Sequence, residues 1–274
     1  MRKNRMLLAV AILMAVLASG AGAQSYLGFD LNDYPGDENL KALRQTFSFA
    51  GYWLNNPPGE NSNTWIGKRR VLESEGFGFL VLFNGRLYAN LKNVYRATRL
   101  GKSDGQAAVN TARGQGFPSG AVIFLDQEQG GRMLPEQKAY IYNWVDVVNA
   151  SSFRAGIYCS GIAAQESPGV NIVSADDIRQ NASGRKIVYF VTNDACPPSP
   201  GCAFPKKSPS PAQSGIAFAD VWQFAQSPER RDVAAHCPAN YNPDGNCYPP
   251  GVDPKKKLHV DVETANSADP SRGR

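Results

Sequence analysis

Two carboxylates follow an apolar segment in the middle of the chain and could share one site. Asp126 and Glu128 come directly after "AVIFL", with Gln127 between them. Side chains two residues apart on a strand share a face and lie about 6.5–7 Å apart along it. When two carboxyl groups lie close together in apolar surroundings, one can stay protonated while the other is ionised. The pair therefore predicts acid–base chemistry, and capping of the next helix is the alternative role.

The elements that would position this pair follow from the apolar segments of the chain. Eight of them are bounded by turn residues, and several are apolar on both faces, as in a parallel sheet covered on both sides. The predicted strands are 26–30, 49–54, 77–83, 121–126, 154–159, 186–192, 220–225 and 258–263. The predicted helices are 39–47, 63–76, 104–116, 134–151 and 174–183, whereas 194–218 and 227–257 are rich in Pro, Gly and Asn.

This alternation predicts an α/β fold of the (β/α)8 TIM-barrel type over residues 24–266. Irregular loops would replace some of the last helices. The alternative is an open doubly wound sheet, but no G-x-G-x-x-G motif follows the first strand and no phosphate loop is present. Residues 267–274 are expected to form a disordered tail.

The C-terminal ends of the strands carry the chemistry in barrels of this type. Those ends add acidic, aromatic and amide side chains to the pair, a set that suits a sugar site. Glycoside hydrolysis divides the roles of acid and stabiliser between two carboxyl groups. Packing within the barrel is the alternative for the aromatic residues, and turn formation is the alternative for Asn84. Substrate contacts are predicted for Asp30, Tyr52, Asn84, Tyr158, Trp222, Gln223 and Asp261.

The first residues have the layout of a cleavable secretory signal peptide. Arg2, Lys3 and Arg5 precede the apolar run "MLLAVAILMAVLA", and the small residues "AGA" end at position 23. The run of about 13 residues is shorter than the ~20 that a membrane-spanning helix needs. We therefore expect cleavage after residue 23, a secreted or periplasmic protein, and no stable membrane span.

The charge balance gives no reason to expect a nucleic acid partner. The formal charge of +5 includes the three cations of the signal peptide, which leaves 5 − 3 = +2. The basic runs at 229–231 and 253–257 are more typical of solvated loops than of a polyanion site. We expect a monomer.

Five cysteines are present, and secretion favours disulfides. Cys196 and Cys202 bracket one short turn-rich loop, and Cys237 and Cys247 bracket another. The local pairs 196–202 and 237–247 are therefore the first choice among the possible pairings. Cys159 is left over. The absence of a C-x-x-C motif, together with only two histidines in the chain, argues against a metal site, and no cofactor is expected.

Five segments in order along the chain carry a resemblance to known families. They are "YLGFDLNDYPG", "VIFLDQE", "GIYCSG", "VWQFA" and "LHVDVETAN". Together they resemble the glycoside hydrolase family 25 lysozymes and, more closely, the secreted glycoside-hydrolase-like family known as domain of unknown function 1906. The resemblance spans residues 26–266. It implies a (β/α)8-type barrel and, from the lysozymes, cleavage of the muramic acid–glucosamine linkage of peptidoglycan.

The same resemblance implies roles for single residues. Glu128 matches the general acid of the lysozymes and Asp126 the neighbouring carboxylate. The chain departs from them at Gln127, where a small residue is usual, and at Glu263, where the lysozymes have Asn. The other matched positions are Asp30 and Asp261 at the ends of the first and last strands, and the cleft-lining pair Trp222 and Gln223.

Two functions of different classes follow. The first is a secreted glycoside hydrolase that acts on an amino-sugar polymer such as peptidoglycan, with Glu128 as the acid and Asp126 as stabiliser or nucleophile. The second is a cell-wall or glycan-binding protein that keeps the cleft without turnover.

Overall fold

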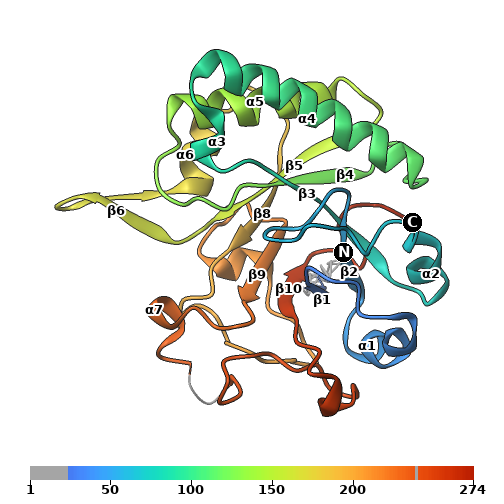
Figure 1. Ribbon diagram of the computed structural model, residues 1–274. Coiled ribbons are helices and arrows are strands. Elements are labelled where there is room, and N and C mark those ends of the chain that lie inside the picture. The colour runs from blue at the N-terminus through green and yellow to red at the C-terminus, as the bar shows by residue number, and fades with distance from the viewer. Residues whose placement is uncertain (1–23, 238–239) are drawn as a thin grey trace, which may run out of the picture.

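Eight strands close into one barrel in the computed structural model, which describes residues 24–237 and 240–274 (Figure 1). The predicted signal peptide lies outside the described residues. The order around the barrel is β1-β10-β9-β8-β5-β4-β3-β2. All eight predicted strands are confirmed, and their ends differ from the predicted ones by at most three residues. The strands are β1 (Tyr26–Asp30), β2 (Phe49–Trp53), β3 (Gly78–Asn84), β4 (Val122–Asp126), β5 (Arg154–Ser160), β8 (Val188–Thr192), β9 (Val221–Ala225) and β10 (Asp261–Ala265).

Helices cover the outside of the barrel between most of its parallel strands. They are α1 (Leu40–Thr46), α2 (Arg69–Ser74), α3 (Tyr88–Leu91), α4 (Val94–Gly114), α5 (Pro135–Asn149), α6 (Ser174–Gln180) and α7 (Arg231–Ala234). Short 3-10 turns form at η1 (Asp37–Asn39), η2 (Pro211–Ser214) and η3 (Pro254–Lys256). None of the helices in the described ranges is long and apolar enough to cross a membrane.

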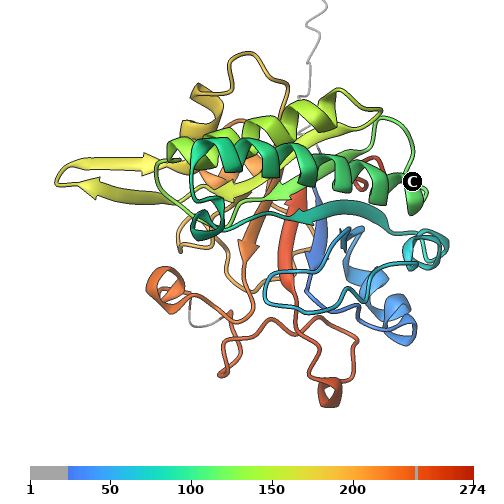
Figure 2. The ribbon, with the colours of Figure 1, turned by 45° about the horizontal axis from the view of Figure 1, so that its top comes forward.

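The longest helix, α4, begins ten residues before the predicted one. Asn93 caps it, because its side-chain oxygen accepts a hydrogen bond from the Arg96 N–H at 2.9 Å. Helices α4 and α5 lie side by side on one flank of the barrel (Figure 2). A Cβ atom at Gly101 would lie 2.3 Å from the Tyr140 carbonyl oxygen, so this glycine permits the close approach of the two helices.

A hairpin that the sequence analysis did not predict projects from the barrel. Its strands are β6 (Ala163–Ser167) and β7 (Val170–Val173), and both views show it reaching away from the body (Figures 1 and 2). Most of its side chains are exposed. A strand with no buried face carries no apolar alternation, so the pattern on which strand prediction depends is missing here.

The direction of β10 departs from the all-parallel barrel that we expected. β10 runs antiparallel to both of its neighbours, β1 and β9, whereas the other adjacent pairs are parallel. Among the described residues between β9 and β10, no long helix carries the chain back to the opposite end of the barrel. β10 therefore enters at the end where β9 finished, and Asp261 is its first residue rather than a residue at its exit.

Two disulfides join the irregular loops that replace the last helices. Cys196 bonds to Cys237 and Cys202 bonds to Cys247, with Cα–Cα distances of 5.8 and 5.4 Å. The choice of these four cysteines is confirmed, but the predicted local pairing is wrong. The loop after β8 lies against the loop after β9, so each bond joins one loop to the other, and spacing along the chain cannot reveal that arrangement. Cys159 is a free thiol within the core.

The last eight residues are not the disordered tail that we predicted. Asp269 accepts a hydrogen bond from the Phe79 N–H at 2.9 Å, and the Ser271 hydroxyl accepts one from the Val81 N–H at 2.8 Å. The backbone of Ser271 also bonds to Phe79 and Val122. The chain end is ordered because it satisfies backbone groups at the start of β3 and β4 that would otherwise be buried without partners.

Candidate active site

A cavity of about 190 Å³ opens at the end of the barrel where the parallel strands finish. Asp30 and Asp126 are the last residues of β1 and β4, Glu128 follows two residues after β4, and Asp261 begins β10. The cavity therefore collects six of the nine predicted site residues. Its full lining is Asp30, Asn32, Trp53, Pro58, Leu82, Asp126, Glu128, Tyr158, Phe190, Gln223, Gln226 and Asp261.

Asp126 and Glu128 enter this cavity at different depths. The Asp126 side chain is buried, whereas that of Glu128 is exposed. Burial raises the pKa of Asp126 well above its ordinary value, and the nearby charges of Glu128 and Asp30 raise it further. When it is protonated, Asp126 can donate a hydrogen bond to Glu128, which lies within hydrogen-bonding reach. In the free protein, the buried member of the pair therefore favours its protonated form.

Asp30 and Asp261 face each other across the antiparallel pair β1–β10. Burial raises the pKa of Asp30 to about 6, and the charge of Glu128 acts in the same direction. Burial, followed by the charge of Asp30, raises the pKa of Asp261 well above its ordinary value. Three buried carboxyl groups at one end of the barrel thus all favour protonation more than a carboxyl group in water does.

Gly51 makes room for Asp30. A Cβ atom at Gly51 would lie 2.4 Å from the Asp30 Cβ, far closer than two carbon atoms can approach. We expect Gly51→Ala to displace Asp30 and to lower the free energy of unfolding by about 1–3 kcal/mol. Gly114 lies in α4 with open space around it, so Gly114→Ala is the matched control and should cost no stability. Equal thermal unfolding midpoints for the two variants would contradict the assigned contact.

Gln223 connects the carboxyl groups of Asp30 and Asp261 to the side chain of Tyr158. Its Nε2 donates to Asp30 Oδ2 at 3.3 Å and to Asp261 Oδ2 at 3.1 Å. Its Oε1 accepts from the Tyr158 hydroxyl at 2.7 Å and from Gln226 Nε2 at 3.1 Å. Each of these contacts uses the amide in the sense that its chemistry allows. Gln223 therefore holds two acids and one aromatic ring in fixed positions around the cavity.

A further carboxyl group lies beneath Asp30. Glu263 is fully buried on β10, and none of the described residues donates a hydrogen bond to either of its oxygens. Burial raises the pKa of Glu263 well above its ordinary value, and the charge of Asp30 adds to this. A neutral Glu263 can donate its proton to Asp30, which lies within hydrogen-bonding reach. At the position where the lysozymes have Asn, Glu263 thus offers Asp30 a second hydrogen-bond donor besides Gln223 Nε2.

Tyr52 does not line the cavity, and its predicted substrate contact is corrected. Its hydroxyl donates to Gln115 Oε1 at 2.7 Å, at the end of α4, and its ring packs against Phe117. Successive residues of a strand face opposite sides, so Trp53 is the residue of β2 that lines the cavity. Because β2 is buried on both sides, its pattern alone could not show which side faces the interior.

Trp222 and Asn84 do not line the cavity either, and their predicted substrate contacts are also corrected. Trp222 is fully buried and its indole N–H donates to the Asn193 carbonyl oxygen at 2.8 Å, while the next residue, Gln223, faces the cavity. The Asn84 amide donates to the Asn56 carbonyl oxygen at 2.9 Å, so it holds the loop after β2 in place, a role that differs from both substrate contact and the local turn formation left open by the sequence. Among the cavity residues that the sequence analysis missed, Gln226 follows β9 directly and Asn32 lies just after β1.

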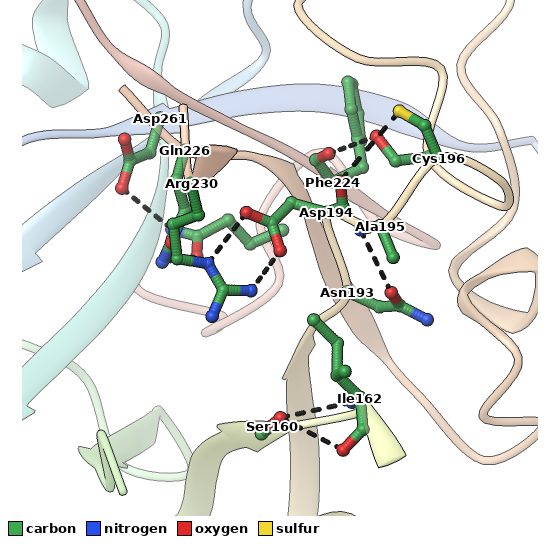
Figure 3. A network of polar contacts seen from close by, with 12 residues as sticks. Ser160, Ile162, Asn193, Asp194, Ala195, Cys196, Phe224, Gln226, Arg230 and Asp261 are labelled. Atoms are coloured by element: carbon green, nitrogen blue, oxygen red, sulfur yellow. Dashed lines mark hydrogen bonds and ion pairs between the residues drawn. The ribbon is translucent and has the colours of Figure 1, made fainter. Parts of the chain in front are cut away.

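An ion pair ties together the two long loops beside the cavity. Arg230 forms a two-pronged contact with the fully buried Asp194, and its Nε lies 2.9 Å from Asp194 Oδ2 (Figure 3). Figure 3 also shows Asp261 and Gln226 close to this pair. Asp261 Oδ1 accepts from the Ser227 N–H at 2.7 Å. The loop after β9 therefore orients one cavity acid and is itself anchored to the loop after β8.

Neither a metal site nor a thiol nucleophile is evident in the described part of the chain. No group of three or more His, Cys, Asp or Glu side chains there is arranged to hold a metal ion. Burial raises the pKa of the Cys159 thiol to about 12, so the reactive thiolate form is disfavoured.

Part of the chain is similar to a known family of glycoside hydrolase-like domains. Residues 67–194 match the family described as "Rv2525c-like, glycoside hydrolase-like domain". This match confirms the resemblance drawn from the sequence. No curated protein sequence matches the chain.

Solved structures share the fold at low sequence identity. An uncharacterised protein of B. stearothermophilus has a TM-score of 0.54 at 19% identity, covering 88% of this chain and 95% of its own. The Mycobacterium tuberculosis Tat-secreted protein Rv2525c, in complex with HEPES, has a TM-score of 0.50 at 12% identity, covering 92% and 98%. GHIP, a glycosyl hydrolase 25 of Streptococcus pneumoniae, has a TM-score of 0.50 at 15% identity, covering 87% and 86%. These similarities establish the fold, a TIM-like α/β barrel.

Proposed function

We propose that this protein is an extracytoplasmic glycoside hydrolase that cleaves an amino-sugar polymer such as peptidoglycan. The observation that carries the proposal is the meeting of Asp30, Asp126, Glu128 and Asp261 in one cavity at the end of the barrel where active sites lie. The two disulfides and the predicted signal peptide support a location outside the cytoplasm.

The pair Asp126 and Glu128 supplies the acid. Because burial raises the pKa of Asp126, a proton shared by the pair favours the buried Asp126 in the free protein. A sugar chain that covers Glu128 removes water from it, which favours its neutral form and draws the proton toward it. Glu128 then donates this proton to the glycosidic oxygen as the bond from that oxygen to the anomeric carbon breaks. Water adds to the anomeric carbon and returns a proton to the pair.

Positive charge develops at the anomeric carbon in the transition state. After proton transfer, Asp126 is left ionised and stabilises that charge directly or through the acetamido group of the sugar. Asp30 and Asp261 add to the negative field when they are ionised, and Gln223 holds both in place. Preorganised charges of this kind are effective because they need no rearrangement during the reaction.

The shape of the site supports a polymer rather than a single sugar. A second depression of about 360 Å³ shares Asp30, Asn32 and Asp261 with the cavity, so the two adjoin, and together we call them the groove. Trp53 and Tyr158 offer aromatic surface along the cavity wall, which can pack against the apolar faces of sugar rings.

The second candidate is a glycan-binding protein that keeps the groove without turnover. The observation in its favour is the number of raised carboxyl pKa values, because neutral acids bind sugar hydroxyls without cleaving the chain. The departures from the lysozymes at Gln127 and Glu263 also belong to this alternative.

One assay separates the two functions. The protein is incubated with insoluble peptidoglycan from pH 4 to pH 8, and both the retained protein and the released reducing ends are measured. We expect retention together with reducing ends in the acidic part of this range, where the pair holds its proton. Retention without reducing ends at every pH would favour the binding protein. If the protein is not retained and releases no reducing ends, peptidoglycan is not its ligand.

A further inference from the structure

One exposed face of the protein combines apolar and basic side chains in a way that the barrel does not require. It is formed by α3, the first three turns of α4 and the start of α5, and we call it the α3–α4 face. Of the seven large hydrophobic side chains that are exposed in the described ranges, five lie here, and Tyr95 is 74% exposed. The face consists of Leu87, Tyr88, Val94, Tyr95 and Leu134 together with Lys92, Arg96, Arg99 and Lys102.

Hydrogen bonds hold the parts of this face together. The Tyr88 N–H donates to Gln129 Oε1 at 2.7 Å, and Gln137 Nε2 donates to the same oxygen at 3.3 Å. Gln137 Oε1 in turn accepts from the Leu134 N–H at 2.9 Å. These bonds join α3 to the start of α5, and Figure 1 shows α3 beside the beginning of α4. α3 is therefore fixed against the start of α5, and α4 begins three residues after α3 ends.

The orientation of α4 directs its basic side chains to solvent. Ala97 and Gly101 are buried on the side of α4 that packs on the protein. Tyr95, Arg99 and Lys102 are spaced three and four residues apart, so they share the opposite side. The Arg99 guanidinium lies over the Tyr95 ring, 5.9 Å from its centre, as basic and aromatic groups do on a common surface.

The charge of this face is strongly one-sided. Residues 85–103 contain five Lys and Arg residues and no Asp or Glu. Arg86 is neutralised by Asp104, which its Nη2 contacts at 2.8 Å. The other four cations form no ion pair with a carboxylate of the described residues. Four cations that form no ion pair among the described residues thus accompany five exposed apolar side chains, in a chain whose balance without its first 23 residues is only +2.

We propose that the α3–α4 face docks on an anionic phospholipid surface. Lys and Arg near such a surface are attracted to the negative headgroups, and Tyr, Leu and Val side chains enter the boundary between headgroups and acyl chains. An anionic polymer in solution would use the charges but would gain nothing from Leu87, Val94 and Leu134. The combination therefore favours a lipid surface, and this inference is independent of the proposed hydrolase activity.

Docking would also place the cavity next to the membrane. Gln129, which joins α3 to α5, follows Glu128 directly in the chain. The α3 end of this face therefore lies close to the loop that carries Glu128, and a docked protein would act on material close to the bilayer.

The test is sedimentation with lipid vesicles. The protein is used from Gln24 onward, because every barrel strand lies within residues 26–265 and the apolar run near the N-terminus would itself bind lipid. We expect binding to vesicles of phosphatidylglycerol and phosphatidylcholine, and little binding to phosphatidylcholine alone. Changing Lys92, Arg96, Arg99 and Lys102 to Gln should weaken binding about fivefold for each cation removed. Changing Leu87, Tyr88 and Tyr95 to Ser should weaken it with the charge unchanged.

The control removes the same charge from other exposed positions, by changing Lys206, Lys207, Lys255 and Lys257 to Gln. This control should keep its binding, and circular dichroism should show that every variant is folded. Absence of binding to anionic vesicles at 0.15 M salt would overturn the proposal, as would an equal loss in the control. Binding to dextran sulfate as tight as to vesicles, and unaffected by the Ser variant, would point to a soluble polyanion instead and would also overturn it.

Discussion

Replacing Glu128 by Gln is expected to lower the rate of glycan cleavage by about 10²–10⁴-fold, the usual contribution of a positioned acid. Gln has the size of Glu but no proton of the required acidity. Glu128 is exposed at the mouth of the cavity, so the change leaves no buried group without a partner and should not affect folding. Release of reducing ends measures the rate, and sedimentation with peptidoglycan measures binding, which should stay nearly intact.

Glu136→Gln is the matched control for this variant. Glu136 lies in the first turn of α5 and does not line the cavity, so the same chemical change there should leave the rate unchanged. If Glu128→Gln kept the full rate, Glu128 would not be the acid. If both binding and cleavage were lost, the residue would act in substrate binding and its assignment as a proton donor would lose its support.

The second large effect concerns stability, which should fall as the pH rises from 4 to 8. The pKa of Asp30 is about 6 in the folded protein and 3.8 in the ordinary, exposed state. Between these values the folded protein holds a proton that the unfolded chain releases, so rising pH favours unfolding. About two pKa units correspond to roughly 3 kcal/mol of unfolding free energy. The raised pKa values of Asp126, Asp261 and Glu263 act in the same direction.

Asp30→Asn tests this effect because Asn cannot ionise. The variant should lose less stability than the wild type between pH 4 and pH 8, and Asp33→Asn, a change at an exposed position three residues away, should behave like the wild type. Urea unfolding at several pH values measures the difference. A wild-type stability that rises between pH 4 and pH 8 with the same slope as that of Asp30→Asn would show that the Asp30 pKa is not raised.

Several parts of the site could be predicted because they depend on strand ends. Asp30 and Asp126 each follow an uninterrupted apolar strand, and in a parallel barrel such ends meet at one rim, as the cavity shows. Asp261 was predicted for this rim as the end of a parallel strand. It does reach the rim, but as the first residue of the antiparallel strand β10. The sequence thus predicted the correct position of the Asp261 side chain but the wrong direction of its strand.

Other features depend on contacts between distant segments, and local sequence patterns carry little information about them. The choice between Tyr52 and Trp53 required knowing which side of a strand buried on both sides faces the interior of the barrel. The disulfide pairing required knowing that two long loops lie against each other. Predicting that the C-terminal residues are ordered required knowing that Ser271 forms hydrogen bonds to the start of β3 and of β4.

By itself the sequence determined the barrel strands, the acidic pair after the fourth of them and the identity of the bonded cysteines. Those features are recorded in the spacing of apolar, acidic and cysteine residues along a short stretch of chain. Only the tertiary structure decided the direction of the last strand, the disulfide partners, the cavity-facing aromatic residues and the place of Glu263 beneath Asp30. Each of these depends on which distant groups share a buried space, and burial in that space also raises the pKa values of the acids.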